Sequence, residues 1–426
     1  MKKIGVAILG LGVVGGGTYK ILTQHREFYK NNHGVDISVE CVLERNVRRA
    51  LELGLEESKV CGNIAEICSN PEVDIVVEVI GGVEPAKSFV LAALNSGKSV
   101  VTSNKELFCK YSHELEQAAK KNRVGLFYEA TCVGGVPVIR AMLDNLQGNN
   151  FHSLTGIING TTNYILTAMS NDGSSYKSAL EEAQKLGYAE ADPTSDVEGY
   201  DSSYKLSILS SIAFHTKVPF SEIYREGITD IDNADIIYGK QLGFVLKLLA
   251  IGKNDESGIE VRVHPAFIKN THPLANVNDS FNAVYLKGDS VDDVMLYGRG
   301  AGALPTGSAI VGDIIYCATH PNHSYSSFKN TEKADPSTKF VKNFESEYYI
   351  RLSAEDKAGV LSKITSHLSK HSISIAQFVQ ESAHGGEKAP LVIITHLTKE
   401  HNVRKAVEDI NATGIAKVDS VIRVLS

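Results

Sequence analysis

The stretch "AILGLGVVGGG", residues 7–17, decides the fold of the first part of this chain. It follows a β-branched apolar run and opens a helical pattern, and its glycines have the spacing G-x-G-x-x-G. The first glycine permits a tight turn, and the second lets the backbone approach a pyrophosphate at the N-terminus of the helix. The alternative is a glycine-rich turn that binds nothing. We predict a dinucleotide site on the backbone of Gly10, Leu11, Gly12, Val13, Val14 and Gly15.

Short apolar strands alternate with helical patterns along the residues around this stretch, which indicates a parallel sheet covered by helices. Near-continuous apolar runs such as "DIVVEVI" (74–80) are typical of strands buried on both faces. The predicted strands are 4–9, 37–43, 73–80, 98–103 and 123–129, and the predicted helices are 15–30, 64–69, 85–96 and 106–121. The expected fold of residues 1–136 is therefore a Rossmann-type α/β domain.

Residues 137–299 have a different pattern, which predicts a mixed or antiparallel sheet in an α+β domain. The predicted strands are 153–160, 258–268 and 281–288, and the predicted helix is 175–187, which ends at Gly187. After this region a further helix is predicted over 304–320. The polar residues 321–346 are expected to form a linker. Residues 347–426 show the pattern β-α-β-β-α-β of a ferredoxin-like module.

Composition narrows the classes of function. The chain has 426 residues, 43% hydrophobic and 22% charged, and a net charge of -7, which argues against binding to nucleic acid or to a membrane surface. No apolar run approaches the roughly 20 residues that span a bilayer, and the N-terminus does not resemble a cleaved signal peptide. The six scattered cysteines are expected to be reduced thiols of a cytoplasmic protein.

The second predicted strand ends in two opposite charges, Glu44 and Arg45. An acid at this position usually holds a ribose hydroxyl of NAD, whereas an arginine accommodates the 2′-phosphate of NADP. The two residues give conflicting indications, since Arg45 favours NADP and Glu44 permits NAD. The alternative is a pair of exposed charges without a ligand.

A second group of charged residues could carry chemistry. Ser103 and Lys105 lie at the carboxyl end of a predicted strand, where ligands bind in open α/β sheets. In "DVEGYDSSYKLSILSSIAFH" (196–215), which looks like one amphipathic helix, Asp201 and Lys205 are four residues apart and share a face. A lysine near acids can serve as a proton donor or acceptor. The alternatives are a solvent-exposed lysine at a helix N-terminus and a solvated ion pair of about 0.3–0.5 kcal/mol.

Six motifs in order resemble those of the homoserine dehydrogenase family: "GLGVVGGG", "EVIGG", "VTSNKELF", "YEATCVGGVPVI", "GIINGTTNYIL" and "AEADPTSDVEGYDSSYKLSILSSIAF". The resemblance covers essentially the whole chain. It implies the NAD(P)-linked interconversion of L-homoserine and L-aspartate 4-semialdehyde, a step toward threonine, methionine and isoleucine.

The resemblance also implies roles for individual residues. Lys205 and Lys105 would be the catalytic lysines, with Lys205 handling the proton, and the substrate would be held by Glu190, Asp196 and Asp201. Gly187 and Gly302 would border the cofactor, so that residues 300–320 would complete the nucleotide-binding domain. Sodium or potassium would bind the backbone carbonyls of Glu129, Cys132, Gly134 and Val136.

The C-terminal module resembles an ACT domain, whose ligand loop would contain Asp356 and Gly359. Feedback by threonine and assembly into a homodimer or homotetramer are implied, although the module could serve only to build the oligomer. Two other functions stay open. One is an aspartate-semialdehyde dehydrogenase, which needs a nucleophilic cysteine such as Cys132. The other is a redox sensor that binds a dinucleotide and an amino acid without catalysis.

Overall fold

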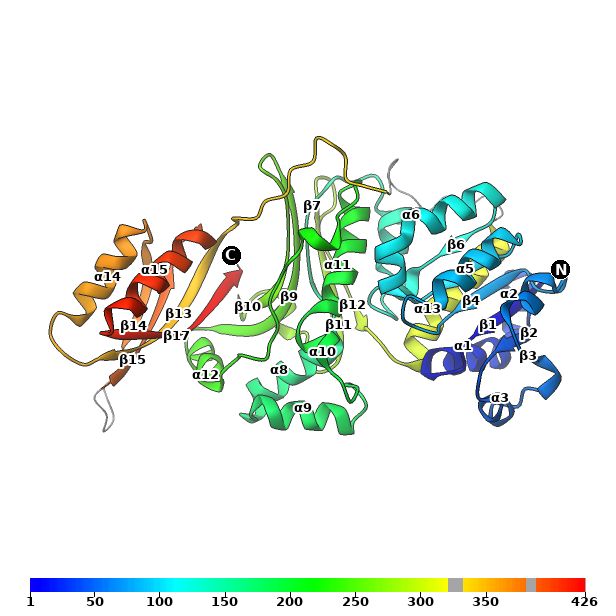
Figure 1. Cartoon of the computed structure of the whole chain (residues 1–426), viewed down its shortest axis with the longest axis horizontal. Coiled ribbons are helices and arrows are strands. Elements are labelled where there is room, and N and C mark those ends of the chain that lie inside the picture. Colours follow the sequence, from blue (N-terminus) through cyan, green and yellow to red (C-terminus); the bar gives the residue numbers. More distant parts are fainter. Residues whose placement is uncertain (321–331, 381–387, 426) are drawn as a thin grey trace.

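Three lobes lie in a row in the computed structural model, which describes residues 1–320, 332–380 and 388–425 (Figure 1). The N-terminal lobe is built on a six-stranded parallel sheet, and the central and C-terminal lobes share a second sheet. The chain returns from the central lobe to the N-terminal lobe through one long helix before it enters the C-terminal lobe. The expected α/β, α+β and ferredoxin-like parts are all present.

The sheet of the N-terminal lobe has the strand order β3-β2-β1-β4-β5-β6. The strands are β1 Lys2–Leu9, β2 Val35–Leu43, β3 Val60–Cys61, β4 Ile75–Glu78, β5 Ser99–Thr102 and β6 Leu126–Phe127. The helices are α1 Val13–Gln24, α2 Arg26–His33, α3 Val47–Glu52, α4 Ile64–Ser69, α5 Ala86–Asn95 and α6 Lys105–Asn122. The strand order reverses between β1 and β4, so a crevice for a ligand is expected at their carboxyl ends. The predicted single helix over 15–30 is wrong, because His25 leaves the helical conformation and separates α1 from α2.

Helix α13 (Ala303–Thr319) packs against α1 in the N-terminal lobe. Gly17 makes the close approach possible, because a Cβ atom there would lie 2.2 Å from the carbonyl oxygen of Ala303. Ile310 and Ile314 of α13 are buried in the same apolar core as the strands β1 and β2. In the sequence, residues 137–299 thus separate two segments that both belong to the N-terminal lobe.

The second sheet has the order β12-β11-β7-β9-β10-β17-β13-β15-β14, with β8 and β16 beside this path. Its central strands are β7 Phe151–Ile157, β8 Tyr224–Arg225, β9 Phe244–Asp255, β10 Gly258–Lys269, β11 Phe281–Gly288 and β12 Asp292–Arg299. Those of the C-terminal lobe are β13 Glu345–Glu355, β14 Ile375–Gln380, β15 Lys388–Thr395, β16 Thr398–Lys399 and β17 Ala416–Leu425. Strands β10 and β17 pair in parallel through 266–268 and 423–425, so the sheet runs across both lobes.

The C-terminal lobe has the expected order of elements, with helices α14 Val360–Lys370 and α15 Glu400–Thr413 on one face of its strands (Figure 1). Part of the predicted linker is bound to the central lobe, since Phe340 forms a bridge with Ile259 of β10. Residues 321–331 of that linker lie outside the described part of the chain.

The helices of the central lobe are α7 Val138–Arg140, α8 Gly160–Asp172, α9 Tyr176–Lys185, α10 Thr194–Val197, α11 Tyr200–Ala213 and α12 Asn233–Gln241. Gly187 follows α9 with φ 76°, as expected of a glycine that ends a helix. The expected single helix over 196–215 is wrong, because Gly199 has φ 77° and separates α10 from α11. Helix α11 is almost entirely buried, and it contacts α6, β9 and β10.

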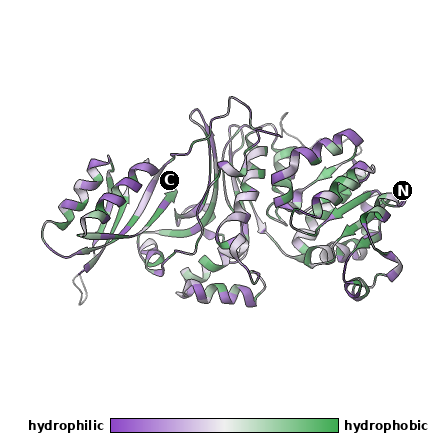
Figure 2. Cartoon of the chain, viewed as in Figure 1, coloured by the Kyte–Doolittle hydropathy of each residue, from purple (hydrophilic) through white to green (hydrophobic). Residues whose placement is uncertain are grey.

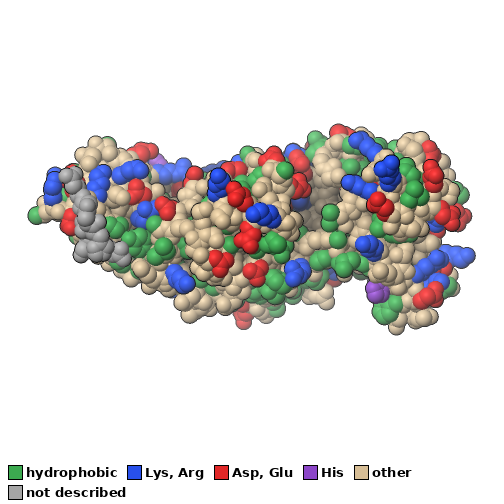
Figure 3. Space-filling view, turned by 90° about the horizontal axis from the view of Figure 1, so that it is seen from below, with side chains coloured by type: hydrophobic (Ala, Val, Ile, Leu, Met, Phe, Trp, Pro, Cys, Tyr) green, Lys and Arg blue, Asp and Glu red, His purple; other side chains and the backbone are tan. Residues whose placement is uncertain are grey.

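Hydrophobic residues line the strands, and hydrophilic residues cover the outer faces of the helices (Figure 2). On the face shown in Figure 3, acidic and basic side chains are interspersed. Within the described ranges no helix combines the length and the hydropathy that crossing a membrane requires.

Candidate active site

Asp201 joins two lysines that come from different lobes. Its Oδ1 lies 2.9 Å from Nζ of Lys105, the first residue of α6, and its Oδ2 lies 2.7 Å from Nζ of Lys205, one turn further along α11. The side chain of Lys205 is 10% exposed and that of Lys105 is 40% exposed, so Lys105 is the more accessible of the two lysines. Two amines therefore meet on one buried carboxylate.

Asn159 connects this cluster to Asp196. Its side-chain amide donates to Asp196 Oδ1 at 2.7 Å and to Asp201 Oδ2 at 2.9 Å. The side-chain oxygen of Asn159 caps α8 by accepting from the backbone N–H of Thr162. The amine of Lys205 also donates to the carbonyl of Ile158, at 2.9 Å. The end of β7 and the start of α8 thus supply hydrogen bonds that hold Asp196, Asp201 and Lys205 in place.

Charge and burial act on the acids in opposite directions. Burial alone would raise the pKa of Asp201, but the ammonium groups of Lys105 and Lys205 lower it well below its ordinary value. Burial, together with the charge of Asp201, raises the pKa of Asp196. Asp201 in turn raises the pKa of Lys105. One acid of the pair is therefore firmly ionised, while the other is easier to protonate.

The glycine-rich loop between β1 and α1 has the shape that a dinucleotide requires. Gly10 has φ 94°, and a Cβ atom on Gly15 would lie 2.0 Å from the carbonyl oxygen of Gly10. A Cβ atom on Gly12 would meet no atom within 4 Å, so its backbone faces open space. The first and third glycines are thus required by the protein itself, whereas Gly12 keeps a surface free for a ligand.

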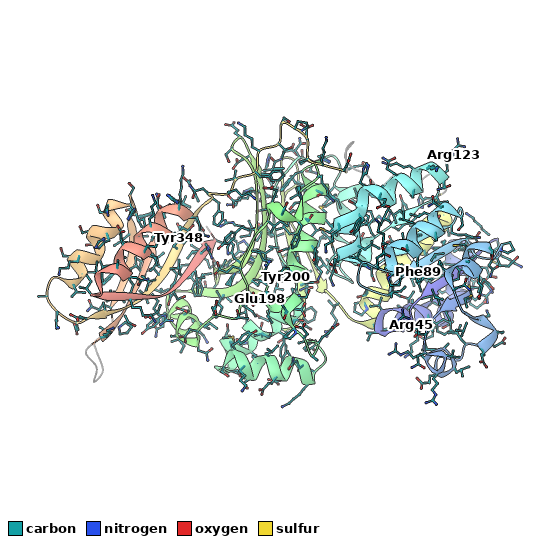
Figure 4. The ribbon with its side chains drawn as sticks, viewed as in Figure 1. Arg45, Phe89, Arg123, Glu198, Tyr200 and Tyr348 are labelled. Carbon is teal, nitrogen blue, oxygen red and sulfur yellow. The ribbon has the colours of Figure 1, made fainter. Side chains whose placement is uncertain are left out.

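Glu44 turns toward this loop. Its carboxylate accepts hydrogen bonds from the backbone N–H of Leu11 at 2.7 Å and of Asn46 at 2.9 Å. Arg45 is exposed on the N-terminal lobe, where Figure 4 labels it. The two charges at this strand end therefore have different surroundings, with Glu44 held by the backbone and Arg45 open to solvent.

A buried acid supports the ends of β4 and β5. Glu78 accepts from the hydroxyl of Thr102 at 2.6 Å and from the backbone N–H of Ile80 at 2.9 Å. Asn104 caps α6 and donates to the carbonyl of Gly82 at 2.6 Å. These bonds link the loop 80–82 to the start of α6, and they fix the position from which Lys105 reaches Asp201.

The loop 129–136 joins the N-terminal and central lobes. The carboxylate of Glu129 accepts from the backbone N–H groups of Ile139 and Arg140, at 3.0 and 2.6 Å. Burial, reinforced by Asp313, raises the pKa of Glu129 to about 8. Val133 and Gly134 have φ 56° and 41°, and a Cβ atom on Gly134 would lie 2.5 Å from the carbonyl oxygen of Gly300. The loop is therefore tightly packed against the start of the returning segment.

Comparison with known proteins identifies the family. The profile of homoserine dehydrogenase matches residues 137–315, that of its NAD binding domain matches 10–129, and that of the ACT domain matches 348–414. The homoserine dehydrogenase of Bacillus subtilis is 37% identical and covers 100% of this chain and 99% of its own. The chain belongs to the homoserine dehydrogenase family. The family assignment from the six motifs is confirmed.

Solved structures of the family agree with this fold. The homoserine dehydrogenase from Thiobacillus denitrificans is 41% identical, covers 100% of this chain and 99% of its own, and has a TM-score of 0.93. A mutant hyperthermophilic archaeal homoserine dehydrogenase in complex with NADPH is 29% identical, covers 76% of this chain and 100% of its own, and has a TM-score of 0.64. The chain is thus an oxidoreductase of this family with an ACT domain.

In this member of the homoserine dehydrogenase family, some of the predicted site residues lie together and others lie apart. Lys105, Lys205, Asp196 and Asp201 form one cluster. Glu190 is exposed on the loop after α9, where its carbonyl accepts from Gln184. Gly187 and Gly302 have positive φ angles, 76° and 122°. The backbone N–H of Ser103 donates to the carbonyl of Glu78 at 3.3 Å. Asp356 and Gly359 are exposed before α14.

Cys132 is unsuited to nucleophilic catalysis. It is completely buried, and burial raises the pKa of its thiol to about 12. A nucleophilic cysteine needs the opposite shift, toward the thiolate. The environment of Cys132 therefore argues against an aspartate-semialdehyde dehydrogenase.

Two site residues were missed from the sequence. Asn159 is signalled only by its place before "GTTN", where it caps a helix. Glu78 is the last residue of the apolar strand β4, and a buried acid at a strand end is a usable indication of a polar network. Both residues position other groups, and positioning of this kind depends on neighbours that are distant in sequence.

Proposed function

We propose that this protein interconverts L-homoserine and L-aspartate 4-semialdehyde with a nicotinamide cofactor, in the biosynthesis of threonine, methionine and isoleucine. The observation that carries the proposal is the contact of Lys105 and Lys205 with the two oxygens of Asp201, at 2.9 and 2.7 Å. A redox sensor without catalysis has no need of two amines on one buried acid. The names of the relatives support the same substrate.

The residues of the cluster divide the chemistry among them. When bound, the nicotinamide exchanges a hydride with the substrate carbon. Lys205 takes the hydroxyl proton during oxidation and returns it during reduction, and in its charged form it stabilises the developing alkoxide. Lys105 positions the substrate beside the cofactor. Asp196 and Asp201, together with Glu190 from the exposed loop, hold the substrate ammonium group.

NADP is the proposed preferred cofactor, with NAD as an alternative. Arg45 is exposed at the strand end, where a 2′-phosphate would need a cation. Glu44 is held by the backbone N–H groups of Leu11 and Asn46, which offset part of its charge. The structure of an archaeal relative with NADPH supports this preference. Ser103, Gly187 and Gly302 would complete the cofactor site together with the glycine-rich loop.

A sodium or potassium ion is proposed at the backbone carbonyls of Glu129, Cys132, Gly134 and Val136. Carbonyl oxygens are hard ligands that suit such cations. The side chain of Cys132 does not matter for ligation by its backbone carbonyl. The described residues contain no group of three or more His, Cys, Asp or Glu side chains that could hold a metal. Replacing sodium and potassium by choline in the assay buffer should lower the activity if the ion is needed.

The ACT domain is proposed to bind threonine at the loop of Asp356 and Gly359 and to regulate a homodimer or homotetramer. The loop is exposed, and Gly359 has φ 88° at the start of α14. The proposed domains are 1–136 with 300–320, 137–299 and 347–426, joined by the linker 321–346. The six free thiols, all in described parts of the chain, support a cytoplasmic location.

One assay tests the central proposal. Initial rates of homoserine oxidation are measured with NADP and with NAD, in the presence and absence of threonine. The Lys205→Ala variant should lose most of kcat, by at least about 100-fold, because it lacks the proton acceptor, while binding of NADPH is retained. Near-normal turnover by this variant would remove Lys205 from the mechanism. Absence of homoserine oxidation by the wild-type protein would reject the proposed function.

A further inference from the structure

A short segment of the central lobe, residues 224–229, lies between the acids of the active site and the C-terminal lobe. We call it the clamp segment. Its first two residues form β8, which pairs in parallel with β10 through Tyr224–Arg262 and Arg225–Val263. The same β10 pairs with β17 of the C-terminal lobe further along. The clamp segment is therefore bound to the strand that joins the two lobes.

One side of the clamp segment holds the turn between α10 and α11. The guanidinium of Arg225 donates to the carbonyl of Glu198 and lies 3.6 Å from the centre of the Tyr200 ring. The backbone N–H of Ile228 donates to the carbonyl of Val197 at 2.8 Å. Figure 4 shows Glu198 and Tyr200 side by side in the central lobe. Each residue of this turn is thus bonded to, or packed against, the clamp segment.

The contact is too close for a side chain at Gly227. A Cβ atom on Gly227 would lie 2.5 Å from the carbonyl oxygen of Val197 and 2.8 Å from Cα of Glu198. Gly199 has φ 77°, and a Cβ atom there would lie 3.4 Å from Cγ of Arg225. Two backbones therefore touch directly, and a shift of one segment has to move the other.

The clamped turn separates the two acids of the active site. Asp196 precedes it in α10, and Asp201 follows it in the first turn of α11. Both acids accept from the side chain of Asn159, at 2.7 and 2.9 Å, so their separation is matched to one amide group. A small rotation at Gly199 would move Asp201 relative to Asp196, and with it the point where the two lysines meet.

The other side of the clamp segment is bonded to the C-terminal lobe. The carboxylate of Glu226 pairs with the guanidinium of Arg423 in β17, and it also accepts from the hydroxyl of Tyr224 at 2.9 Å. Arg423 is itself buried, and it donates to Glu400 at the start of α15, at 2.6 Å. Since a guanidinium makes planar paired contacts, this bond fixes direction as well as distance.

We propose that Arg225 is a positioning residue for the substrate-binding acids Asp196 and Asp201, and that the ion pair of Glu226 with Arg423 lets the C-terminal lobe set the geometry of the substrate site. The inference rests on the proposed function for its readout, since it assigns these acids to homoserine. Arg225 acts through the turn 197–200 and touches neither lysine in the described contacts. Its loss should therefore weaken homoserine binding more than it slows the chemical step.

The test compares steady-state constants of full-length variants. Arg225→Met removes the donors and keeps an apolar chain over Tyr200, and it should raise KM for homoserine about tenfold, the loss expected for one hydrogen bond from a charged group. KM for NADP should not change, because none of the residues assigned to the cofactor lies in the clamp segment or in the turn 197–200. Arg225→Lys, which keeps one donor, should restore part of the affinity. Glu226→Gln should raise KM for homoserine in the same direction and by less.

Arg351→Met is the matched control. Like Arg423, Arg351 joins the C-terminal lobe to an acid of the central lobe; it pairs with the buried Asp235 at 2.6 Å, which lies on α12 and not in the clamped turn. The control should lower stability and leave KM for homoserine unchanged. Equal KM values for Arg225→Met and the wild type, or an equal rise in the Arg351 control, would overturn the proposal.

A second measurement does not depend on activity. The backbone N–H of Ser203 is bonded to the carbonyl of Gly199 in the first turn of α11. Hydrogen exchange at this turn should be faster in Arg225→Met than in the wild type, and unchanged exchange would contradict the clamp. If the wild-type protein does not oxidise homoserine, the proposed function fails, and this measurement still decides whether Arg225 holds the turn.

Discussion

Replacing Asp201 by asparagine should change the pH at which Lys105 loses its proton. The amine lies 2.9 Å from Asp201 Oδ1, and Asp201 is the main cause that raises the pKa of Lys105 above its ordinary value. An opposite charge at such a distance favours the charged form of the amine, so removing it lowers the pKa of Lys105. Because 40% of the Lys105 side chain is exposed, solvent screens part of this interaction.

Activity should be lost as the pH rises, because Lys105 is proposed to bind the substrate in its cationic form. In the wild type its pKa is raised, so the ammonium form persists into the alkaline range. In Asp201→Asn the ammonium form is lost at a lower pH, and kcat/KM for homoserine should begin to fall at a lower pH than in the wild type. The assay is the pH profile of kcat/KM at saturating NADP, from neutral to alkaline pH.

Asp313→Asn is the control for loss of a buried acid. Asp313 pairs with Arg140 at 2.8 Å, so its replacement also breaks a buried ion pair, but one without a described contact to either lysine. The titration of the homoserine amine is common to all three enzymes and cancels in the comparison. If the alkaline limb of Asp201→Asn coincides with that of the wild type, Asp201 does not control the ionisation of Lys105.

Three further changes have defined outcomes. Gly17→Ala should lower the free energy of unfolding by about 1–3 kcal/mol, because the new Cβ would lie 2.2 Å from the Ala303 carbonyl, whereas Gly16→Ala, whose nearest neighbour is 3.7 Å away, should be neutral or slightly stabilising; denaturant unfolding compares the two. Glu129→Gln should flatten the pH dependence of stability: the wild type loses at most about 1.4 kcal/mol per pH unit between the ordinary pKa of a glutamate and the raised value of about 8, since ionisation of the buried group opposes folding. The chain has no tryptophan, so tyrosine emission reports its unfolding. Arg45→Ala should raise KM for NADP and leave KM for NAD nearly unchanged, and an equal rise for both cofactors would exclude recognition of a 2′-phosphate.

Most of the regular structure followed from local patterns. The glycine-rich turn, the parallel strands and the elements of the C-terminal module were predicted at or near their observed positions. The prediction failed where one residue changes the chain direction, at His25 between α1 and α2 and at Gly199 between α10 and α11. A single residue outside the helical region leaves the hydrophobic periodicity of its neighbours intact, so the pattern alone could not reveal either break.

Strands β9 and β12 were not predicted at all. Strand β9, "FVLKLLAIGKND", has an apolar run that periodicity cannot distinguish from a buried helix. It also buries Lys247, which donates to Asn163, to the carbonyl of Val277 at 2.6 Å and to Asn278. A lysine in a core strand is tolerated only because three acceptors from two distant segments surround it, and neither segment is close to Lys247 in sequence.

The spacing of residues along the chain was enough to place Asp201 beside Lys205, because side chains four apart on a helix share a face. It was also enough to predict the tight turn at Gly10, since few residues other than glycine adopt its positive φ. The meeting of Lys105 with Asp201 was decided by tertiary structure, through the packing of α6 against α11. The same holds for the sheet that continues from β10 into β17. Local geometry acts over a few residues, whereas contacts between distant segments depend on how whole faces bury their apolar surface.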